Sequence, residues 1–352
     1  MRGLVIRMRK GIILGLMVSF CFLNVGFAAS NILAVEAGHT WKFIVFGDTP
    51  DKNINSTTGI TPNLSMLATA IATEKPAFVV HIGDLISGIA LMSASPVYQN
   101  YPVQFQNFQA AMQPIYAAKI PFYAMRGNRE YGKSAEDTQI TKAYADAIAR
   151  SMPQNGPPTE RGLTYSFEHN NSKMIVLDEF TGSENSNITL NLNWLKTELN
   201  NNRKPVVFVF GHSPAFDVNQ AGGIHDYDKN PGYFLYANKE LSGDFWKLLK
   251  DNNVRAYIVG HLHFYSRGEN NGIWQVVQGN DGPPIDYDPQ KVTRELVNVF
   301  PQQQISKANI VPGYLSCLVN EGSNDVVCSE WVVDQTGNKK LMDTITMSPR
   351  KP

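Results

Sequence analysis

The sequence predicts an α/β fold in which two facing mixed β-sheets are flanked by helices. Short apolar runs of strand length alternate with segments whose apolar residues recur at helical spacing, and this alternation is typical of α/β proteins. Five of the apolar runs also end in glycine followed by a residue with an oxygen or nitrogen ligand atom. The 352 residues suffice for one large domain or two ordinary ones. Since no repeat divides the chain, we expect a single domain over residues 39–345.

The first half of the domain is expected to alternate strand and helix. The helix after the first strand shows a 3.6-residue period in Leu64, Leu67 and Ile71. Phe105 and Phe108 stand at helical spacing and are expected in the core. We expect strands at 41–46, 77–82 and 121–125, and helices at 64–75, 96–119 and 134–151, the last a polar surface helix.

The second half is expected to begin a second sheet and to continue the alternation. Leu192, Leu195 and Leu199 mark an amphipathic helix. The connections 215–233 and 282–313 are longer than loops without a function usually are. We expect strands at 165–167, 174–177, 206–210, 256–259 and 273–277, a hairpin around Gly322, and helices at 188–199 and 241–248.

A polar residue follows each of five strands where the strand leaves the core. In chain order the motifs are Gly47-Asp48, Gly83-Asp84, Gly127-Asn128-Arg129-Glu130, Gly211-His212 and Gly260-His261-Leu262-His263. In open α/β sheets, ligands bind beyond the carboxyl ends of the strands, so we expect these side chains to converge. Each of them alone could be an ordinary turn or loop residue. The ordered set instead favours metal ligation.

This ordered set resembles the calcineurin-like metallophosphoesterase superfamily, which includes the purple acid phosphatases. The resemblance covers about residues 41–335, and it implies the sandwich fold of that superfamily and a site for two metal ions. It also implies that Asp84 bridges the two ions. By the same resemblance, the remaining ligands are Asn128, His212 and His261 on one ion and Asp48 and His263 on the other.

The resemblance also implies a reaction. Two divalent cations about 3.5–4 Å apart can bind the oxygens of a phosphoester and generate hydroxide from water near neutral pH. We therefore predict an enzyme, a metal-dependent phosphohydrolase, in which a metal-bound hydroxide attacks a phosphoester or phosphoanhydride bond of a small phosphorylated substrate. Imidazole, carboxylate and amide ligands suit Mn, Zn or Fe.

The first motif departs from the family pattern, because Pro50 stands where most members have a ligand histidine. The purple acid phosphatases also lack that histidine and supply a tyrosine three residues after the bridging aspartate, where this chain has Ser87. The metal shell of Asp48 is therefore one ligand short. Asp51, a backbone carbonyl or water are the candidates to complete it. We expect the two ions to bind with unequal tightness.

The second departure is Arg129, which stands where a histidine usually aids the leaving group. Arginine stays protonated and cannot act as a general acid, but it can hold two phosphate oxygens. A similar Gly-Asn-Arg-acid motif occurs in a lipid A pathway pyrophosphatase branch of the superfamily. We predict that Arg129 is a catalytic residue that stabilises transition-state charge, and that substrates with good leaving groups are preferred. Glu130 is expected to orient a neighbour or to lie on the surface.

Residues 1–28 are predicted to be a secretory signal peptide. Four basic residues precede the apolar segment Gly11–Leu23, which is shorter than the ~20 residues that span a bilayer. Gly26-Phe27-Ala28 is a small-x-small cleavage site. We therefore expect an exported protein, periplasmic or secreted, with no membrane span after signal removal. The rest of the chain holds 27 basic and 31 acidic residues, and this balance gives no nucleic-acid-binding signature.

Cys317 and Cys328 are the two cysteines beyond the predicted signal peptide. They are equally spaced from the centre of the quartet 321–324, so they would face each other if that quartet were the turn of a hairpin. Export to an oxidising compartment then predicts a disulfide bond. Two buried thiols are the alternative.

Two other functions are weighed against hydrolysis. The first alternative is a catalytically impaired family member that acts as a binding or scaffold protein. It is suggested by Pro50 and Arg129, which depart from the family pattern. A serine hydrolase that uses Ser213 is disfavoured, because Gly211-His212-Ser213-Pro214 lacks the glycine-framed elbow of such enzymes.

Overall fold

The computed structural model describes residues 39–51, 56–88, 100–131, 138–181, 188–216, 235–279, 298–299 and 312–350. The chain divides into two compact units, 1–35 and 36–352, and every described residue lies in the second. The predicted signal peptide lies outside the described residues, as do most of the predicted loops 215–233 and 282–313. None of the helices within the described ranges is long and apolar enough to cross a membrane.

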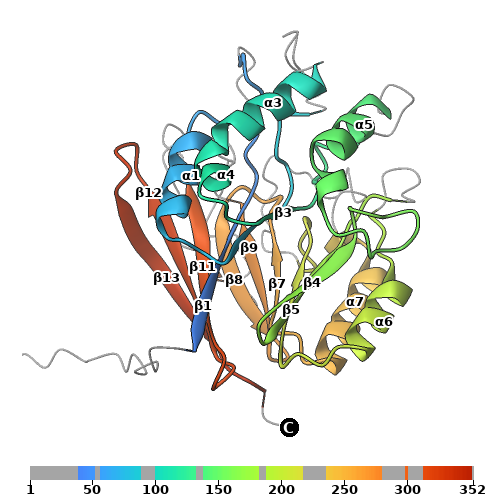
Figure 1. Cartoon of the computed structure of the whole chain (residues 1–352). Helices are drawn as coiled ribbons and strands as arrows, with labels where there is room; N and C mark the ends of the chain where they lie inside the picture. The colour runs from blue at the N-terminus through green and yellow to red at the C-terminus, as the bar shows by residue number, and fades with distance from the viewer. Residues whose placement is uncertain are drawn as a thin grey trace, which may run out of the picture. The chain divides into compact units, whose positions relative to one another are not determined.

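The first sheet has six strands in the order β13-β12-β11-β1-β2-β3 (Figure 1). Strands β1, β2 and β3 are parallel to one another, and the other pairs are antiparallel. All four residues of β2 are buried, as is usual for a parallel strand covered on both faces. The strands are β1 Thr40–Phe46, β2 Phe78–His81, β3 Phe122–Ala124, β11 Gly313–Asn320, β12 Val326–Val333 and β13 Lys339–Met347.

The second sheet has seven strands in the order β10-β8-β9-β7-β6-β5-β4. Its centre, β5, β6, β7 and β9, is parallel, and antiparallel strands flank this centre on both sides. The predicted class of two mixed sheets is thereby confirmed. The strands are β4 Tyr165–His169, β5 Ser172–Val176, β6 Val206–Phe210, β7 Ala256–Val259, β8 Tyr265–Asn270, β9 Ile273–Gln278 and β10 Asn298–Val299.

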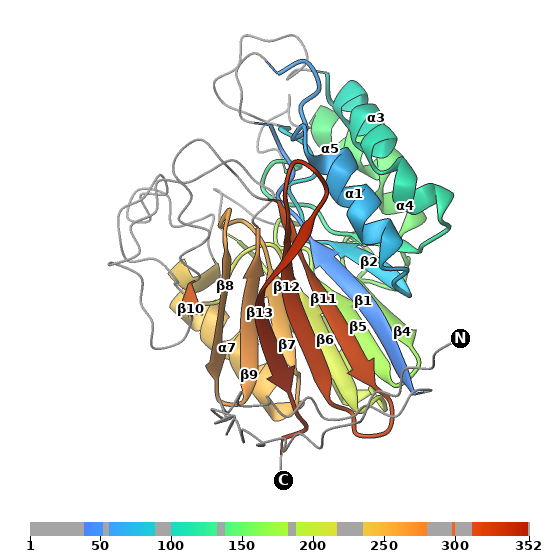
Figure 2. The same ribbon diagram turned by 90° about the vertical axis from the view of Figure 1, so that its left-hand side faces the viewer.

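Alternate residues of β6 enter two hydrophobic clusters, since side chains of a strand point to opposite faces. Phe208 belongs to the cluster between the sheets, where its ring centroid lies 5.0 Å from that of Phe43 in β1. Val209 belongs to the cluster under α6 and α7, which lie side by side over the second sheet (Figure 1). Helices α1, α3 and α4 gather beside β2 instead (Figure 2). The helices are α1 Leu64–Thr73, α3 Tyr101–Ala111, α4 Gln113–Ala117, α5 Thr138–Ala147, α6 Leu192–Asn200 and α7 Lys239–Asp251.

The structure differs from the sequence prediction in several elements. The predicted helix 96–119 is two helices, α3 and α4, that meet at Met112. The predicted polar surface helix is α5, which buries Ile140 and Tyr144. Strands β8 and β13 were not predicted, because both contain charged residues and lack an apolar run. Asn271-Gly272, both at positive φ, forms the two-residue turn between β8 and β9 and is a hairpin signal that could have revealed β8.

The predicted hairpin around Gly322 is confirmed as β11 and β12. Cys317 lies directly opposite Cys328 in the register of the two strands, and the two form a disulfide bond with an S–S distance of 2.01 Å. Both cysteines are fully buried. The predicted disulfide is therefore present, and it joins two neighbouring strands of the first sheet.

Candidate metal centre

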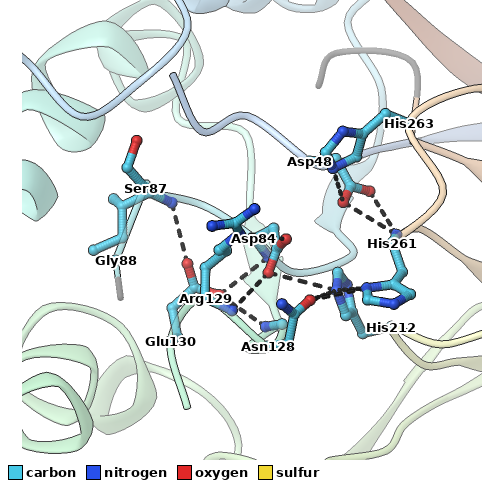
Figure 3. Close-up of polar contacts among 12 residues, drawn as sticks. Asp48, Asp84, Ser87, Gly88, Asn128, Arg129, Glu130, His212, His261 and His263 are labelled. Atoms are coloured by element: carbon cyan, nitrogen blue, oxygen red, sulfur yellow. Dashed lines mark hydrogen bonds and ion pairs between the residues drawn. The ribbon is translucent and has the colours of Figure 1, made fainter. Parts of the chain in front are cut away.

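The six predicted metal ligands lie in loops that directly follow parallel strands of the two sheets. Asp48, Asp84 and Asn128 follow β1, β2 and β3 in the first sheet, and His212 follows β6 in the second. His261 and His263 follow β7. The structure brings all six together, with Asp84 near the centre and Asp48 and His263 at one end (Figure 3). The convergence expected from the strand ends is thus observed.

Three of these residues have the left-handed backbone conformation, which residues other than glycine rarely adopt. The φ angles are 59° at Asp48, 52° at Asp84 and 68° at His261. Backbone hydrogen bonds hold the first two loops together, since Asp48 N donates to Gly83 O at 3.0 Å and Thr49 N donates to Asp84 O at 2.8 Å. Strained backbone of this kind clusters at ligand sites, where the surrounding structure enforces it.

We call Asp84, Asn128 and His212 the Asp84 half of the site. His212 Nε2 lies 3.4 Å from Asp84 Oδ1 and 3.0 Å from Asn128 Oδ1. His261 Nδ1 approaches the same group, at 2.8 Å from Asn128 Oδ1 and 3.2 Å from His212 Nε2. Potential ligand atoms of four residues therefore lie close together, and Asp84 and His212 are almost completely buried.

We call Asp48 and His263 the Asp48 half. Both carboxylate oxygens of Asp48 accept from the backbone N–H of His261, at 3.1 and 2.9 Å. His263 Nε2 lies 3.5 Å from Asp48 Oδ1. One ligand atom each from Asp48, Asp84 and His212 lie within 4.8 Å of one another, so the two halves are close enough to act as one site.

The tautomer of His212 suits a cation. Its Nδ1 lies 2.9 Å from the carbonyl oxygen of Ile82, which can only accept, so Nδ1 carries the proton and Nε2 presents a lone pair. Burial lowers the pKa of His212, which keeps the imidazole neutral, as ligation requires. Nε2 then faces the lone pairs of Asn128 Oδ1 and Asp84, an arrangement that a bound cation would satisfy.

Glycine is required where backbone passes the two carboxylates. A Cβ atom on Gly127 would lie 2.2 Å from Asp84 Oδ1, and one on Gly260 would lie 2.2 Å from Asp48 Oδ2. Real Cβ atoms essentially never approach so closely. The glycines of the motifs therefore create the space that the carboxylates occupy, and the donor set and its packing fit a metal ion.

Arg129 lies beside Asp84, as Figure 3 shows. Its backbone N–H donates to Asp84 Oδ1 at 2.9 Å, and its Nε lies 3.7 Å from Asp84 Oδ2. The side chain is 20% exposed, compared with 2% for that of Asp84. The side chain of Arg129, predicted to be catalytic, is thus more exposed to solvent than the carboxylate of Asp84 beside it.

Glu130 is completely buried, which excludes the surface alternative. Its carboxylate accepts backbone N–H bonds from Asp84 at 3.0 Å, Gly127 at 2.8 Å and Ile86 at 3.1 Å. Burial and then the nearby charge of Asp84 raise the pKa of Glu130. The residue binds the loops after β2 and β3 to each other and so orients Asp84 and the loop that carries Asn128.

The loop after β1 is held by hydroxyl groups. Thr49 Oγ1 donates to Leu85 O at 2.8 Å and lies 3.2 Å from His81 Nε2. Burial lowers the pKa of His81 to about 3, so this histidine is a neutral core residue. Ser87 Oγ donates to the backbone carbonyl of Asp51 at 2.5 Å, and Asp51 is one of the residues considered as a source of a replacement ligand.

Three residues next to the site were missed in the sequence. Arg126 precedes the Asn128 motif, and Asp178 and Glu179 follow β5. Arg126 donates to both oxygens of Asp178, at 2.5 and 2.8 Å, and links the ends of β3 and β5 across the two sheets. Sequence reasoning passed over Asp178 and Glu179 because no glycine follows the apolar run of β5, although two acids directly after a buried strand were a usable signal.

Comparisons with known proteins agree with this geometry. A family model described as calcineurin-like phosphoesterase matches residues 42–265. The uncharacterized protein L509 of Acanthamoeba polyphaga mimivirus is 26% identical over 137 residues, which are 39% of this chain and 44% of the viral protein. The chain thus spans less than half of that relative.

Solved structures share the fold at low sequence identity. A purple acid phosphatase, PPD1 from yellow lupin (Lupinus luteus) seeds, has a TM-score of 0.59 and 16% identity, over 88% of this chain and 54% of that one. PhoD has a TM-score of 0.62 and 14% identity, over 89% of this chain and 72% of that one. GAP50, the anchor in the inner membrane complex of Plasmodium, has a TM-score of 0.54 and 16% identity, over 89% and 90%. The family model spans more than half of the 352 residues, and this chain therefore belongs to the calcineurin-like phosphoesterase family.

Proposed function

We propose that this protein is a metal-dependent phosphohydrolase whose ligands are Asp48, Asp84, Asn128, His212, His261 and His263. The observation that supports the proposal most is the convergence of Asp84, Asn128 and His212, since His212 Nε2 lies 3.4 Å from Asp84 Oδ1 and 3.0 Å from Asn128 Oδ1. Buried charges in proteins are paired or coordinate metal ions, and these atoms are of the types that ligate a cation.

Mn, Zn or Fe ions held there would neutralise the phosphoryl oxygens and lower the pKa of bound water. The protein itself would position these ions and their ligands. Asp84 faces both halves, Glu130 orients it through backbone N–H groups, and the burial of His212 keeps its imidazole neutral. The substrate oxygens would enter from the side of Arg129, whose side chain is 20% exposed.

Arg129 would bind the oxygens of the transferred phosphoryl group. Its guanidinium carries a permanent charge and a planar set of donors that matches a phosphate. Because it supplies no proton to the leaving group, we infer a preference for phosphoanhydrides or activated esters, whose leaving groups need none. We also infer export to the periplasm or the exterior, on the strength of the basic and apolar segment in residues 1–28.

One experiment tests the proposal directly. The protein without residues 1–28 is incubated with Mn²⁺, Zn²⁺ or Fe²⁺ and with chromogenic phosphate monoesters, diesters and an anhydride. We expect metal-dependent release of phosphate or of the chromophore, and its loss in the Asn128→Ala, His212→Ala variant. Equal rates in the variant, or no turnover with any metal, would contradict the proposal.

The second candidate is a binding or scaffold protein that keeps the fold. Pro50 and Arg129 replace residues that the family normally uses, and the similar fold of GAP50 belongs to a protein named as an anchor. A protein of this kind would still bind metal or phosphate without turnover. The same assay separates the two candidates, provided that metal binding is measured alongside it.

A further inference from the structure

Glu179 contacts the backbone of the turn that carries His212. It follows β5, the strand next to β6, and is 1% exposed. Its Oε1 accepts from the backbone N–H of His212 at 2.9 Å, and its Oε2 accepts from the backbone N–H of Ser213 at 2.8 Å. The carboxylate therefore holds the backbone of the turn that carries a predicted ligand.

Tyr257 of β7 completes this contact. Its hydroxyl group lies 2.8 Å from Glu179 Oε1 and 2.8 Å from the carbonyl oxygen of Ser213. The residue is completely buried. Three neighbouring strands of the second sheet, β5, β6 and β7, thus meet at the two residues that follow Gly211.

The packing around Gly211 is too close for any other residue. A Cβ atom there would lie 2.2 Å from the hydroxyl oxygen of Tyr257 and 2.4 Å from Glu179 Oε1. The glycine of this motif is therefore explained by Glu179 and Tyr257 and not by the ligands. A turn that served only to reverse the chain would not need two buried polar side chains against its backbone.

We propose that Glu179, with Tyr257, is a positioning residue that fixes the backbone of His212 and thereby sets the affinity of the Asp84 half for its ion. The inference rests on the proposed metal site. Groups that orient a metal ligand through a hydrogen bond influence affinity although they do not touch the ion. Here the orientation acts through the main chain, while Ile82 O orients the ring.

The carboxylate cannot be replaced by its amide. Both oxygens of Glu179 face backbone N–H donors, so the NH₂ group of a glutamine would face a donor whichever way the amide turned. Glu179→Gln keeps the size of the side chain and still disrupts one contact. A residue that merely filled space would tolerate this substitution.

The test measures Mn²⁺ binding to the metal-free protein by isothermal titration calorimetry, together with the thermal unfolding midpoint. We expect Glu179→Gln to weaken the tighter Mn²⁺ site by ~10–100-fold, the range found for residues that orient metal ligands. Tyr257→Phe should weaken it by about fivefold, the effect of one neutral hydrogen bond. Tyr257→Phe also serves if Glu179→Gln does not fold.

Tyr314→Phe is the matched control. Tyr314 is also completely buried, and its hydroxyl group also lies near a glutamate, at 3.2 Å from Glu74, but in the first sheet on β11. The Mn²⁺ affinity of the Tyr314→Phe variant should equal that of the wild type. Mn²⁺ affinities of the Tyr257 and Glu179 variants that equal the wild-type value would overturn the inference. A wild-type protein that binds no Mn²⁺ would overturn the proposed function with it, so the two failures are distinguishable.

Discussion

The two halves of the site are built differently. Behind the Asp84 half lie buried ionisable groups, namely Glu130, the Arg126–Asp178 pair and Glu179, each bound to backbone or to a partner from another strand. In the described part of the Asp48 half, the carboxylate is held by the backbone N–H of His261 and lies near His263. Pro50, in the same loop, offers no side-chain ligand atom.

This difference indicates in which half the protein holds the predicted ligands in place before an ion binds. In the Asp84 half, ligand positions are fixed by interactions that exist before an ion binds, so little reorganisation opposes binding. For the Asp48 half, the sequence predicts one side-chain ligand fewer than the family pattern, because Pro50 stands in place of a histidine. We therefore expect the two ions to differ in affinity, with the tighter one in the Asp84 half.

The largest effect is expected from the residue that faces both halves. Asp84→Asn should lower kcat/KM by ~10³-fold or more, because it removes the charge that would bridge the two ions. His263→Ala should cost less, since it affects the Asp48 half alone. Steady-state kinetics with a chromogenic phosphoester at saturating Mn²⁺ measures both. A larger loss for His263→Ala would reverse the comparison.

The next effect concerns stability beneath the Asp84 half. Asp178→Asn should lower the free energy of unfolding by about 3 kcal/mol, because it leaves Arg126 charged and buried. Urea titration of the variant measures this change. Asp146→Asn serves as the control, since Asp146 is exposed and pairs with exposed Lys142 and Arg150; the urea midpoint of this variant should equal that of the wild type.

The same pair predicts a pH dependence. Burial alone would raise the pKa of Asp178, but the charge and hydrogen bonds of Arg126 lower it below its usual value. The unfolded chain therefore binds the proton more tightly, so the stabilisation is present above the unfolded pKa of about 3.9 and is lost as the pH falls through the native pKa. Asp178→Asn should lack this part of the acid slope of unfolding free energy. An unchanged slope would show that the pair is not responsible.

A smaller effect is expected at the entrance of the Asp84 half. Arg129→Ala should lower kcat by ~10²-fold, the typical effect of removing one group that stabilises transition-state charge. The kcat of Arg129→Lys should lie between those of the wild type and Arg129→Ala, because lysine keeps the charge but not the planar pair of donors. Single-turnover phosphate release measures the chemical step. An unchanged rate constant in Arg129→Ala would remove the assigned role.

The smallest expected effect is a gain in the Asp48 half. Pro50→His restores the residue that the family pattern has at this position and should tighten the weaker Mn²⁺ site by roughly tenfold. Calorimetric titration of the wild type and the variant gives both affinities. Equal affinities for the two ions in the wild-type protein would contradict the proposed difference between the two halves.

Much of the fold was readable because buried parallel strands are apolar runs. β1, β2, β6 and β7 and the helices α1 and α7 lie where the periodicity placed them. β8 and β13 escaped because antiparallel strands at or near a sheet edge carry charged residues and keep only a weak alternation. The disulfide followed from symmetry about one turn, which is a local property of the chain.

The metal ligands were readable for a similar local reason. A parallel strand delivers its next residues to one edge of the sheet, so Asp48, Asp84 and His212 could be assigned to a single place from their order alone. By itself, then, the sequence determined which side chains converge at this edge of the sheets. The sequence did not determine which groups form hydrogen bonds with the backbone of these residues.

Only the tertiary structure decided what holds those loops. Glu130 binds the N–H of Asp84, Glu179 binds the N–H of His212, and Arg126 binds Asp178 across the two sheets. Backbone N–H groups are the same at every position except proline, so no residue pattern marks which of them a distant carboxylate will meet. That choice depends on which strands become neighbours and how closely glycine lets them approach.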